Sequence, residues 1–378
     1  MNLSKEALQL LGDGGHEQVT VYQNHQLHAV LIVAIHATIP GPNGSVKPSL
    51  GGLRWWPYTI EEGLFDALRL SRYMTLKWLH AWWPSQSDPE RSPPFGGGKA
   101  VLIAPPDADP QELFSWVGTC VEACGGSYVT AEDVGTSVEF CDIIRRKTSH
   151  VGGRATQTGD PDGGDPSPST ALGVMYSMDA LLARLGMKYE SQIFIVEGVG
   201  KTGRPIVEML LERGAGKVKV TDVNEDALSA LCKRHPEVQV IRPDQTLRTA
   251  GSVYVPCAMG NRLTPTVAKD LPRGWKVVCG SANILVWDEA RTGRALESRG
   301  ITLAPDSVVN AGGIIKVHDV LEHRRFSARR LDLALRRIPE QLERVLSYAE
   351  SRGLPPGVAM IEMAEERLAE LRLQASTV

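Results

Sequence analysis

Two lysines and one aspartate stand where charged side chains could do chemistry. Lys99 directly follows Phe95-Gly96-Gly97-Gly98, Lys77 comes late in a predicted helix, and Asp133 lies within the segment Thr130–Thr136. Glycines let backbone and ligand approach closely. A partly buried lysine near another cation loses its proton readily and can act as a base, while a neighbouring carboxylate carries the proton. Taken singly, each of the three could equally be an ordinary surface charge.

A second chemical signal is the turn Gly198-Val199-Gly200-Lys201-Thr202-Gly203. It follows a predicted strand, opens a predicted helix and precedes another strand that ends at Asp222. In such turns the first glycine permits a tight bend, the second admits a pyrophosphate, and the third lets helix and strand pack closely. Asp222 could accept from a ribose 2′-hydroxyl and would repel a 2′-phosphate, so the pattern favours NAD over NADP. The simpler alternative is a glycine-rich turn that binds nothing.

The composition excludes several classes of protein. Among 378 residues, 41 are Lys or Arg and 44 are Asp or Glu, giving a net charge of −3, which argues against nucleic acid as the main partner. No apolar run approaches the roughly 20 residues that span a bilayer, and the N-terminus has no signal-peptide pattern. The six cysteines suggest neither a disulfide scaffold nor a zinc site. We therefore expect a cytoplasmic protein of two domains with reduced thiols, no membrane partner and no bound metal.

The elements that must position the two lysines can be predicted in outline. Segments 18–22 and 27–35 are rich in Val, Ile and Leu and predict strands. A capping box at Thr59–Glu62 opens a helix with one apolar face, which should run to about Ala81. The proline-rich stretch 83–94 cannot continue this helix and predicts a surface loop or flap.

A linker or hinge rich in Gly, Asp and Pro at 154–167 separates this region from alternating strands and helices. Such alternation predicts βαβ units and a parallel sheet. The predicted strands are 192–197, 217–221, 238–241, 252–255, 275–279 and 302–304, and the predicted helices are 169–185, 204–214, 225–234, 327–351 and 356–373. The expected fold class is α/β with two domains, the second a Rossmann-type doubly wound domain.

Colinear stretches of the chain resemble the glutamate/leucine/phenylalanine/valine dehydrogenases, and among them the leucine dehydrogenase-like branch. The resemblance extends from about Gly15 to Leu368. The matching stretches are Gly51–Arg54, Leu70–Lys77, Gly96–Ala100, Thr130–Thr136, Asp165–Thr170, the glycine turn, Pro256–Ala258, Gly280–Asn283, Ala304–Asp306 and Asn310–Gly313.

The resemblance implies NAD-dependent, reversible oxidative deamination of an L-amino acid to a 2-oxo acid and ammonia. On this basis Lys77, helped by the backbone at Gly51 and Gly52, would bind the substrate carboxylate. Lys99 would activate the attacking water, and Asp133 would exchange protons with the amine and the intermediate.

The resemblance also implies the surroundings of these groups. It places the wall of the side-chain pocket at Leu50, Ala131, Ile314 and Val317, which are all apolar and therefore favour an apolar or aromatic amino acid over glutamate. Beyond the glycine turn, the residues that it places at the cofactor are Asp222, Val223, Thr170, Cys257, Ala258, Asn283 and Asn310.

A division into domains follows from the same resemblance. Residues 1–165 would form a substrate-binding and oligomerisation domain, completed by C-terminal helices at 320–378, and 166–319 would form the NAD-binding domain. The reaction would take place in a cleft between them that closes about a hinge near Gly164. Family members assemble through the first domain, so we expect a homo-oligomer, a dimer or larger.

The chain departs from the family pattern in several places. It has insertions at 43–49 and within 83–94, which could form a lid, enlarge the substrate end of the cleft, or be harmless surface loops. Ile284 and Leu285 stand where Asn and Gln are usual, and Lys316 stands where the leucine-type branch often has Asn.

The tryptophan pairs Trp55-Trp56 and Trp82-Trp83 could stack on a large aromatic substrate, although core or interface packing is the favoured interpretation.

Three alternatives to an amino acid dehydrogenase remain open at this point. A specialised enzyme that reductively aminates an unusual 2-oxo acid is compatible with the insertions. A non-catalytic NAD-binding descendant gains weight from the altered residues after Asn283. A 2-hydroxy acid dehydrogenase would need a histidine with an acidic partner and an arginine clamp, whereas the candidates here are two lysines and an aspartate.

Overall fold

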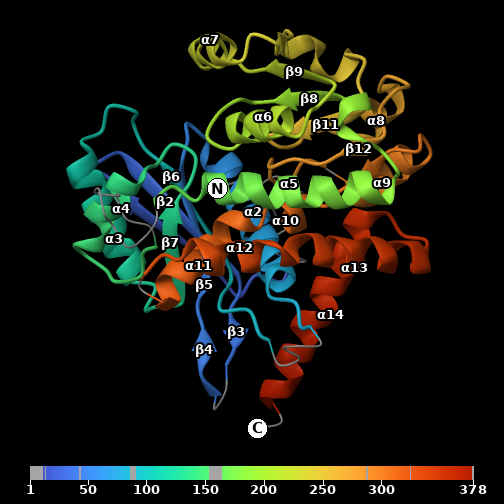
Figure 1. Ribbon diagram of the computed structural model, residues 1–378. Helices are drawn as coiled ribbons and strands as arrows, with labels where there is room; N and C mark the ends of the chain where they lie inside the picture. The colour runs from blue at the N-terminus through green and yellow to red at the C-terminus, as the bar shows by residue number, and fades with distance from the viewer. Residues whose placement is uncertain are drawn as a thin grey trace. The chain divides into compact units, whose positions relative to one another are not determined.

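The computed structural model describes residue 12 and residues 14–41, 44–85, 91–152, 164–286, 288–323 and 325–376. The chain divides into two compact units, each with its own sheet (Figure 1). The first unit comprises 1–164, 317–326 and 364–378, and the second comprises 165–316 and 327–363. Both units combine helices with a β-sheet, so the predicted α/β class and two-domain organisation are confirmed.

The first unit is built on a mixed sheet with strand order β1-β2-β6-β5-β7. The β1/β2 and β2/β6 pairs are antiparallel, whereas β5 runs parallel to both β6 and β7. A separate two-stranded sheet pairs β3 with β4. The strands are β1 (Gln18–Asn24), β2 (Ala29–Ala37), β3 (Ile39–Pro40), β4 (Val46–Lys47), β5 (Ser49–Trp55), β6 (Gly96–Ile103) and β7 (Tyr128–Glu132).

Helices cover both faces of this sheet. On one face α2 (Ile60–Ala81) packs Leu64 and Leu68 against Ile32 and Val101. On the other face α3 (Pro110–Glu122) and α4 (Val138–Arg145) enclose a second core that contains Phe114 and Leu102. Both hydrogen bonds of the predicted capping box form at the start of α2, and the helix ends at Ala81 as predicted. The sequence therefore located the helix that carries Lys77.

The three glycines before Lys99 lie within β6 and let neighbouring backbone approach this strand. A Cβ on Gly96 would lie 1.8 Å from the carbonyl oxygen of Ala37, and one on Gly97 would lie 2.2 Å from the backbone nitrogen of Thr75 in α2. Any larger residue would push β2 or α2 away from the sheet. The glycines thus set how closely α2 packs over Lys99.

The second unit is built on a parallel sheet with strand order β10-β9-β8-β11-β12-β13. Numbered within this unit, the order is 3-2-1-4-5-6, that of a dinucleotide-binding Rossmann sheet. Its strands are β8 (Ile193–Glu197), β9 (Lys217–Thr221), β10 (Gln239–Val240), β11 (Val253–Pro256), β12 (Val277–Val278) and β13 (Thr302–Leu303). Its first helices and turns are α5 (Ser167–Arg184), η2 (Tyr189–Ser191), α6 (Gly203–Glu212), α7 (Glu225–Arg234), η3 (Pro243–Arg248), α8 (Pro265–Asp270) and α9 (Glu289–Glu297).

The C-terminal region differs from the predicted single helix over 327–351. It forms α12 (Ala328–Leu335) and α13 (Arg337–Arg352), which meet at Arg336. Pro339 explains the break, because it has no amide proton to donate to the carbonyl of Leu335 and its ring would clash with that group. The remaining helices are α10 (Asp306–Val309), α11 (Gly312–His323) and α14 (Pro356–Ser376).

The unit boundary at the C-terminus also differs from the predicted one. The prediction assigned all of 320–378 to the first domain, whereas 327–363 belong to the second unit. The reason is packing, since α12 and α13 contact α5, and α13 also contacts α10.

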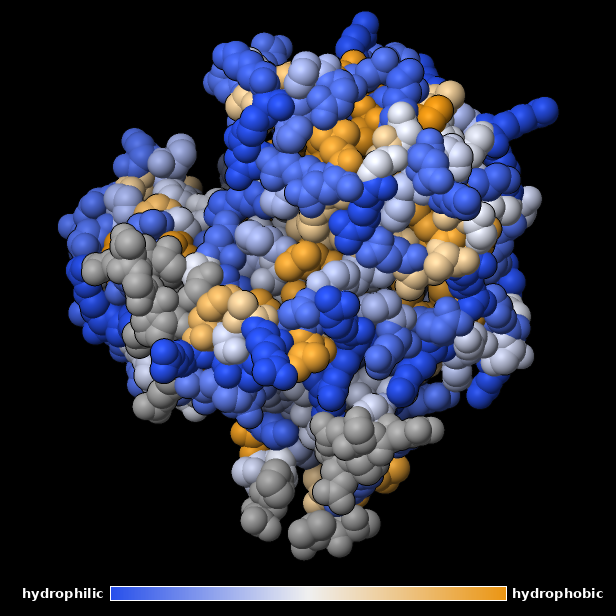
Figure 2. All heavy atoms as spheres, in the orientation of Figure 1, coloured by the Kyte–Doolittle hydropathy of each residue, from blue (hydrophilic) through white to orange (hydrophobic). Residues whose placement is uncertain are grey.

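The surface drawn in Figure 2 is mostly hydrophilic, with small hydrophobic areas scattered over it. Among the described residues, no helix combines the length and the apolar composition needed to cross a membrane.

Candidate functional site

Lys99 and Asp133, which the sequence singled out, lie in contact. The ammonium of Lys99 on β6 donates to Oδ2 of Asp133, the residue that directly follows β7. Lys99 is only 5 % exposed. The backbone amide of Asp133 donates to the hydroxyl of Thr136, whose own proton is within reach of the Leu53 carbonyl. The loop after β7 is therefore tied to β5, and it holds the carboxylate at the lysine.

A third charged residue, Arg54 at the end of β5, completes this group. Its Nε lies 3.0 Å from Oδ2 of Asp133, and its Nη1 lies 2.7 Å from Oδ2 of Asp66. The hydroxyl of Tyr58 donates to the same oxygen of Asp66. Sequence reasoning assigned no role to Arg54, Asp66 or Tyr58. Arg54 stands two residues after Gly52, and this period-two spacing along β5 was the available signal.

Burial and charge shift the pKa values of this group in definite directions. Burial lowers the pKa of Lys99, Asp133 raises it, and the Arg54 cation lowers it further, so the net effect is a lowered value. For Asp133 burial raises the pKa, but Lys99 and Arg54 together outweigh burial and hold it well below the usual range. Asp133 is thus an anion at neutral pH, beside a lysine that releases its proton more easily than an exposed one.

Strand register brings three of the predicted substrate residues, Leu50, Gly52 and Ala131, to the same face of the sheet. Leu50 pairs with Gly97, and Gly52 pairs with Ala131. Because side chains alternate along a strand, these residues and Lys99 point to one side. This is the side covered by α2, since the Cβ position of Gly97 abuts that helix. Gly52 also lies against the network, because a Cβ there would be 2.8 Å from the Cβ of Asp133.

Two of the predicted wall residues meet at a glycine that the sequence did not single out. A Cβ built on Gly152 would lie 3.5 Å from Cγ1 of Val317 and 3.8 Å from Cβ of Ala131. Gly152 is fixed by a 2.7 Å hydrogen bond from its amide to the Thr130 carbonyl. Ile314, the remaining wall residue, belongs to the second unit.

Lys77 and Gly51, the other residues predicted to bind the substrate carboxylate, are both in the first unit. Lys77 is 7 % exposed on α2. The carbonyl of Gly51 accepts a 2.6 Å hydrogen bond from the hydroxyl of Tyr128, and a Cβ on Gly51 would lie 1.6 Å from the Gly98 carbonyl oxygen. The contact with Gly98 requires glycine at this position.

The two insertions contact one another where they are described. Nζ of Lys47 lies 3.3 Å from the hydroxyl of Ser92 and 3.2 Å from the carbonyl oxygen of Pro93. Asn43 and residues 86–90 of these insertions lie outside the described residues, as do residues 154–163 of the predicted linker.

Two of the four tryptophans agree with the favoured interpretation as packing residues, whereas Trp56 is exposed. Trp55 stacks edge-on with Phe114, and Trp82 is buried beside Trp78.

In the second unit the glycine turn has the geometry that its spacing predicted. Gly198 has φ +93°, and a Cβ there would lie 2.9 Å from the backbone nitrogen of Ala258 and the backbone carbon of Cys257. A Cβ on Gly203 would lie 1.9 Å from the Gly198 carbonyl oxygen, so this glycine lets α6 pack against the end of β8. Around Gly200 there is space, with nothing within 4 Å of the Cβ position. The three glycines therefore serve three different purposes.

Asp222 closes the turn. Its carboxylate accepts from the amide of Val199 at 2.7 Å and from the amide of Asn224 at 2.9 Å. The backbone amide of Val199 thus donates to a protein carboxylate and does not point towards solvent or a ligand. The side chain of Val223, next to Asp222, is 88 % exposed.

The other predicted cofactor residues fall into connected groups. Nδ2 of Asn310 donates to Oδ1 of Asn283 at 2.9 Å and to the Ser281 carbonyl at 3.1 Å, and the Ser281 hydroxyl lies 2.9 Å from that of Thr202. Oδ1 of Asn310 is buried without a hydrogen-bond partner. These contacts connect Asn283 through Asn310 and Ser281 to Thr202 in the glycine turn, and the network includes one acceptor without a partner.

Two flanking positions are also fixed by packing. Thr170 on α5 packs against Gly313, whose Cβ would lie 2.7 Å from the Thr170 hydroxyl. Lys201 lies 3.7 Å from the Asp165 carboxylate, and Nζ of Lys316 donates to the Asp165 carbonyl at 2.9 Å. The lysine that replaces Asn at 316 is thus a structural contact to Asp165.

Ile284, one of the departures from the family pattern, has φ +51° and is buried. A β-branched residue is disfavoured in this region, whereas Asn tolerates it. The family's usual Asn therefore suits the backbone here, and the isoleucine occupies the same conformation under strain.

A hollow of about 640 Å³ lies at the end of β8 in the second unit. Its walls include Glu197 at the end of β8, Val223 after β9, and Arg262. Arg262 pairs with Glu197 at 2.8 Å, and Tyr254 donates to the same carboxylate. Ligands of such sheets bind at the carboxyl ends of the strands, where this hollow lies.

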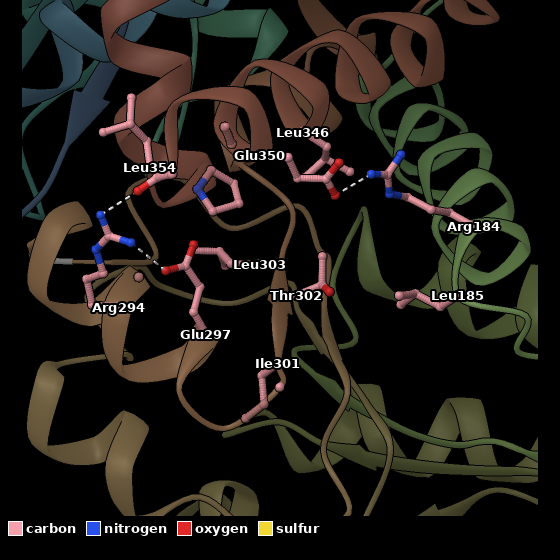
Figure 3. A pocket seen from close by; sticks show the side chains of 15 residues that line it. Arg184, Leu185, Arg294, Glu297, Ile301, Thr302, Leu303, Leu346, Glu350 and Leu354 are labelled. Carbon is pink, nitrogen blue, oxygen red and sulfur yellow. Dashed lines mark hydrogen bonds and ion pairs between the residues drawn. The ribbon is translucent and has the colours of Figure 1, made fainter.

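A second hollow in this unit, of about 360 Å³, contains none of the predicted residues (Figure 3). Its charges satisfy one another: Arg184 pairs with Glu343 and Glu350, and Arg294 lies 3.3 Å from Glu297 and donates to the Gly353 carbonyl at 2.6 Å. Across the described part of the chain, no group of His, Cys, Asp and Glu is arranged to hold a metal ion.

The geometry can be compared with known proteins. Residues 18–150 match the family described as "Glu/Leu/Phe/Val dehydrogenase, dimerisation domain", and residues 223–372 match "Glutamate/Leucine/Phenylalanine/Valine dehydrogenase". These two matches cover most of both units.

Whole-length similarities agree with the family matches. The chain is 37 % identical to a valine dehydrogenase of Streptomyces albus over 95 % of this chain and 94 % of that protein. It is 36 % identical to a leucine dehydrogenase of Bacillus subtilis over 96 % of this chain and 93 % of that one. The structure resembles the L-tryptophan dehydrogenase of Nostoc punctiforme with a TM-score of 0.73 and 27 % identity, covering 97 % of this chain and 99 % of the other.

Proposed function

Since the chain belongs to the glutamate/leucine/phenylalanine/valine dehydrogenase family, we propose that it reversibly converts an apolar or aromatic L-amino acid, water and NAD⁺ to the 2-oxo acid, ammonium, NADH and a proton. The observation that carries this proposal is the buried contact between Lys99 and Asp133. A carboxylate held against a lysine of lowered pKa can pass protons in both directions. Deamination needs such exchange at the amine, at the attacking water and at the tetrahedral intermediate.

Different residues of the first unit would carry out the individual proton transfers. Loss of hydride from the Cα leaves an iminium ion. A water molecule then attacks this ion, and a base takes a proton from the water. Lys99 is the proposed base for this water, because burial and Arg54 both favour its neutral form. Asp133 is the proposed partner of the amine, since it remains charged and can accept the proton that the amine releases. Lys77 would bind the substrate carboxylate, with Gly51 and Gly52 offering backbone at the same site.

NAD, when bound, accepts the hydride. The fit of the second unit to this cofactor rests on the open backbone at Gly200, on the strand order of its sheet and on the acid at the end of β9. Asp222 disfavours a 2′-phosphate at this position. The remaining proposed cofactor contacts are Gly198, Val199, Lys201, Thr202, Gly203, Val223, Thr170, Cys257, Ala258, Asn283 and Asn310.

An apolar substrate side chain is supported by the chemistry of the wall. Leu50 is buried, and Ala131 and Val317 offer only methyl groups beside Gly152. A second carboxylate, as in glutamate, would need a cation there to offset its desolvation. Ile314, also apolar, is the remaining residue proposed for this wall. The relatives named for valine, leucine and tryptophan support this class of side chain.

We also infer a homo-oligomer and a cytoplasmic location. The match of 18–150 to a dimerisation domain supports the first inference. All six cysteines are free thiols, which supports a reducing compartment.

The test is NADH formation at alkaline pH with each of the twenty L-amino acids, for the wild type, Lys99→Met and Lys147→Met. We expect turnover with apolar or aromatic substrates, loss of turnover in Lys99→Met, and wild-type rates in Lys147→Met, whose lysine is exposed. A Lys99→Met enzyme as active as Lys147→Met would contradict the assignment of the base.

The reverse assay, with NADH, ammonia and a panel of 2-oxo acids, separates this proposal from the second candidate. The two insertions contact each other through Lys47, just before the strand that carries Leu50. This contact is the observation that favours an unusual 2-oxo acid as substrate. Turnover only in the reverse assay, and only with an uncommon 2-oxo acid, would establish the biosynthetic alternative. NAD binding with silence in both assays would indicate a non-catalytic protein.

A further inference from the structure

Four aromatic rings form a continuous cluster between the candidate substrate wall and the proline-rich insertion. Trp78 and Trp82, one turn apart on or just after α2, have ring centroids 5.1 Å apart. Phe95 lies 5.2 Å from Trp78, and His318 lies 4.7 Å from Trp82 and 6.3 Å from Phe95. We name these four residues the aromatic cluster.

The aromatic cluster is attached to the wall at two points. The indole nitrogen of Trp78 lies 3.4 Å from the carbonyl oxygen of Leu50 and is its hydrogen-bond donor. His318 directly follows Val317, whose Cγ1 faces Gly152. A displacement of either ring would therefore move a wall residue.

The insertion holds the aromatic cluster from the other side. The guanidinium of Arg91 lies 5.4 Å from the centre of the Trp82 ring, a cation–π distance. The carbonyl of Arg91 accepts from Arg367 on α14 at 3.2 Å. Lys47 fixes the next two residues, Ser92 and Pro93. A surface insertion needs none of these contacts, since long loops cost little free energy.

We propose that the aromatic cluster, held by Arg91 of the insertion, sets the width of the amino-acid side-chain site at Leu50, Ala131 and Val317. Arg91, Trp82 and His318 are positioning residues, because they act through Leu50 and Val317. This inference rests on the proposed function and adds to it the part of the chain that selects substrate size.

The rigidity of the wall determines how sharply it selects substrates by size. A wall discriminates between side chains only if it does not yield, and one methylene in a rigid apolar pocket changes kcat/KM by roughly 10–200-fold. Removing the cation over Trp82 loosens the ring that packs against His318. Val317 can then move, so substrates of different size are accepted more equally.

The test uses the full-length protein and a series of L-amino acids of increasing size, from alanine through valine and leucine to phenylalanine and tryptophan. The variants are Arg91→Met, Trp82→Leu, Trp82→Phe and the control Arg69→Met. Arg69 makes the same kind of contact on the same helix, 5.1 Å over the ring of Phe65, which is not a member of the aromatic cluster. Steady-state kcat and KM are measured for each amino acid, together with the KM for NAD and the melting temperature.

In Arg91→Met we expect the ratio of kcat/KM between the best and the poorest substrate to fall about tenfold, mainly through KM for the amino acid. The KM for NAD should not change. Trp82→Leu should reduce the ratio at least as much, and Trp82→Phe should restore most of it. Arg69→Met should retain the wild-type ranking.

A purely structural cluster would give another result. Equal losses of kcat/KM for every amino acid, or the same change of ranking in Arg69→Met, would overturn the inference while leaving the proposed function intact. A wild type that turns over neither amino acids nor 2-oxo acids would remove the proposed function, and this inference with it.

Discussion

The two units carry candidate sites of different construction. In the first unit the site consists of side chains, Lys99, Asp133 and Arg54, brought together from separate strands. In the second unit it consists of backbone, arranged by glycines within one continuous turn. Charged side chains give chemistry that depends on the type of each residue and on pH. A glycine turn binds through its backbone, and this binding depends on the absence of side chains. A substitution should therefore harm the first site by removing atoms and the second by adding them.

The largest effect should follow from removing the carboxylate of Asp133. We expect Asp133→Asn to lower kcat by about a thousandfold, because the amide cannot accept the proton of the amine. The dissociation constant for NAD should not change, since the turn is made of other residues. The double variant Asp133→Asn with Lys99→Met should be hardly worse than either single one, because the two act as a pair. Stopped-flow and NAD titrations check this, and strictly multiplicative losses would contradict the pairing.

The opposite kind of change should break the second site. Gly203→Ala places a Cβ 1.9 Å from the Gly198 carbonyl oxygen, so the turn must shift. We expect NAD to bind about a hundredfold more weakly, close to 3 kcal/mol, with little change in kcat at saturating NAD. Gly200→Ala is a control for folding alone: nothing of the protein lies within 4 Å of that Cβ, so the melting temperature should not change, although the methyl group would stand where the turn is proposed to admit the pyrophosphate. Calorimetric titration measures the affinity of both variants for NAD. If both melt at the same temperature but differ in affinity, the loss in Gly203→Ala is a loss of binding and not of folding.

The pH dependence should belong to the first site alone. Lys99 must be neutral to act as a base, so kcat/KM should rise with pH through its lowered pKa. Because the Arg54 cation lowers this pKa, Arg54→Met should raise it and shift the rise to higher pH. Arg54→Lys retains the charge and should leave the profile near that of the wild type. Rate profiles between pH 6 and 11, recorded for all three, decide the matter, and identical shifts in both variants would show that charge is not the cause.

A smaller effect should come from adding a methyl group at the substrate wall. The Cβ of Gly152→Ala would contact Val317 and Ala131 at ordinary distances, 3.5 and 3.8 Å, so the fold should tolerate it. The methyl group would occupy space beside the substrate, and we expect kcat/KM for the largest accepted amino acid to fall about tenfold relative to alanine. KM for NAD serves as the internal control. An unchanged ranking of substrates would place Gly152 away from the wall.

The same contrast governs how much could be predicted from the sequence. The capping box and Gly198–Gly203 are local patterns, so the helix of Lys77 and the glycine turn before α6 were both placed correctly. No local pattern marks Gly152, which gains its position from segments distant in the sequence. Arg54 shares the period-two spacing of Gly52 along β5, but only the pairing of β5 with the distant strand β7 brings it to Asp133. The break before α13 was missed because Pro339 falls inside an otherwise helical pattern, where its lost hydrogen bond to Leu335 decides the outcome.

The smallest effect tests whether the two units are separate in stability as well as in chemistry. His28 is exposed, with φ +48°, in the turn between β1 and β2 of the first unit. Glycine has no steric penalty there, so His28→Gly should stabilise this unit by about 0.5–1 kcal/mol. His25→Gly, in the same turn but outside the positive-φ residues, should stabilise nothing, because it only adds freedom to the unfolded chain. In calorimetry, His28→Gly should raise the melting temperature of the first unit by about 2 °C and leave that of the second unit unchanged. A common shift of one transition would instead show that the units unfold together, so that damage to either site lowers the stability of both.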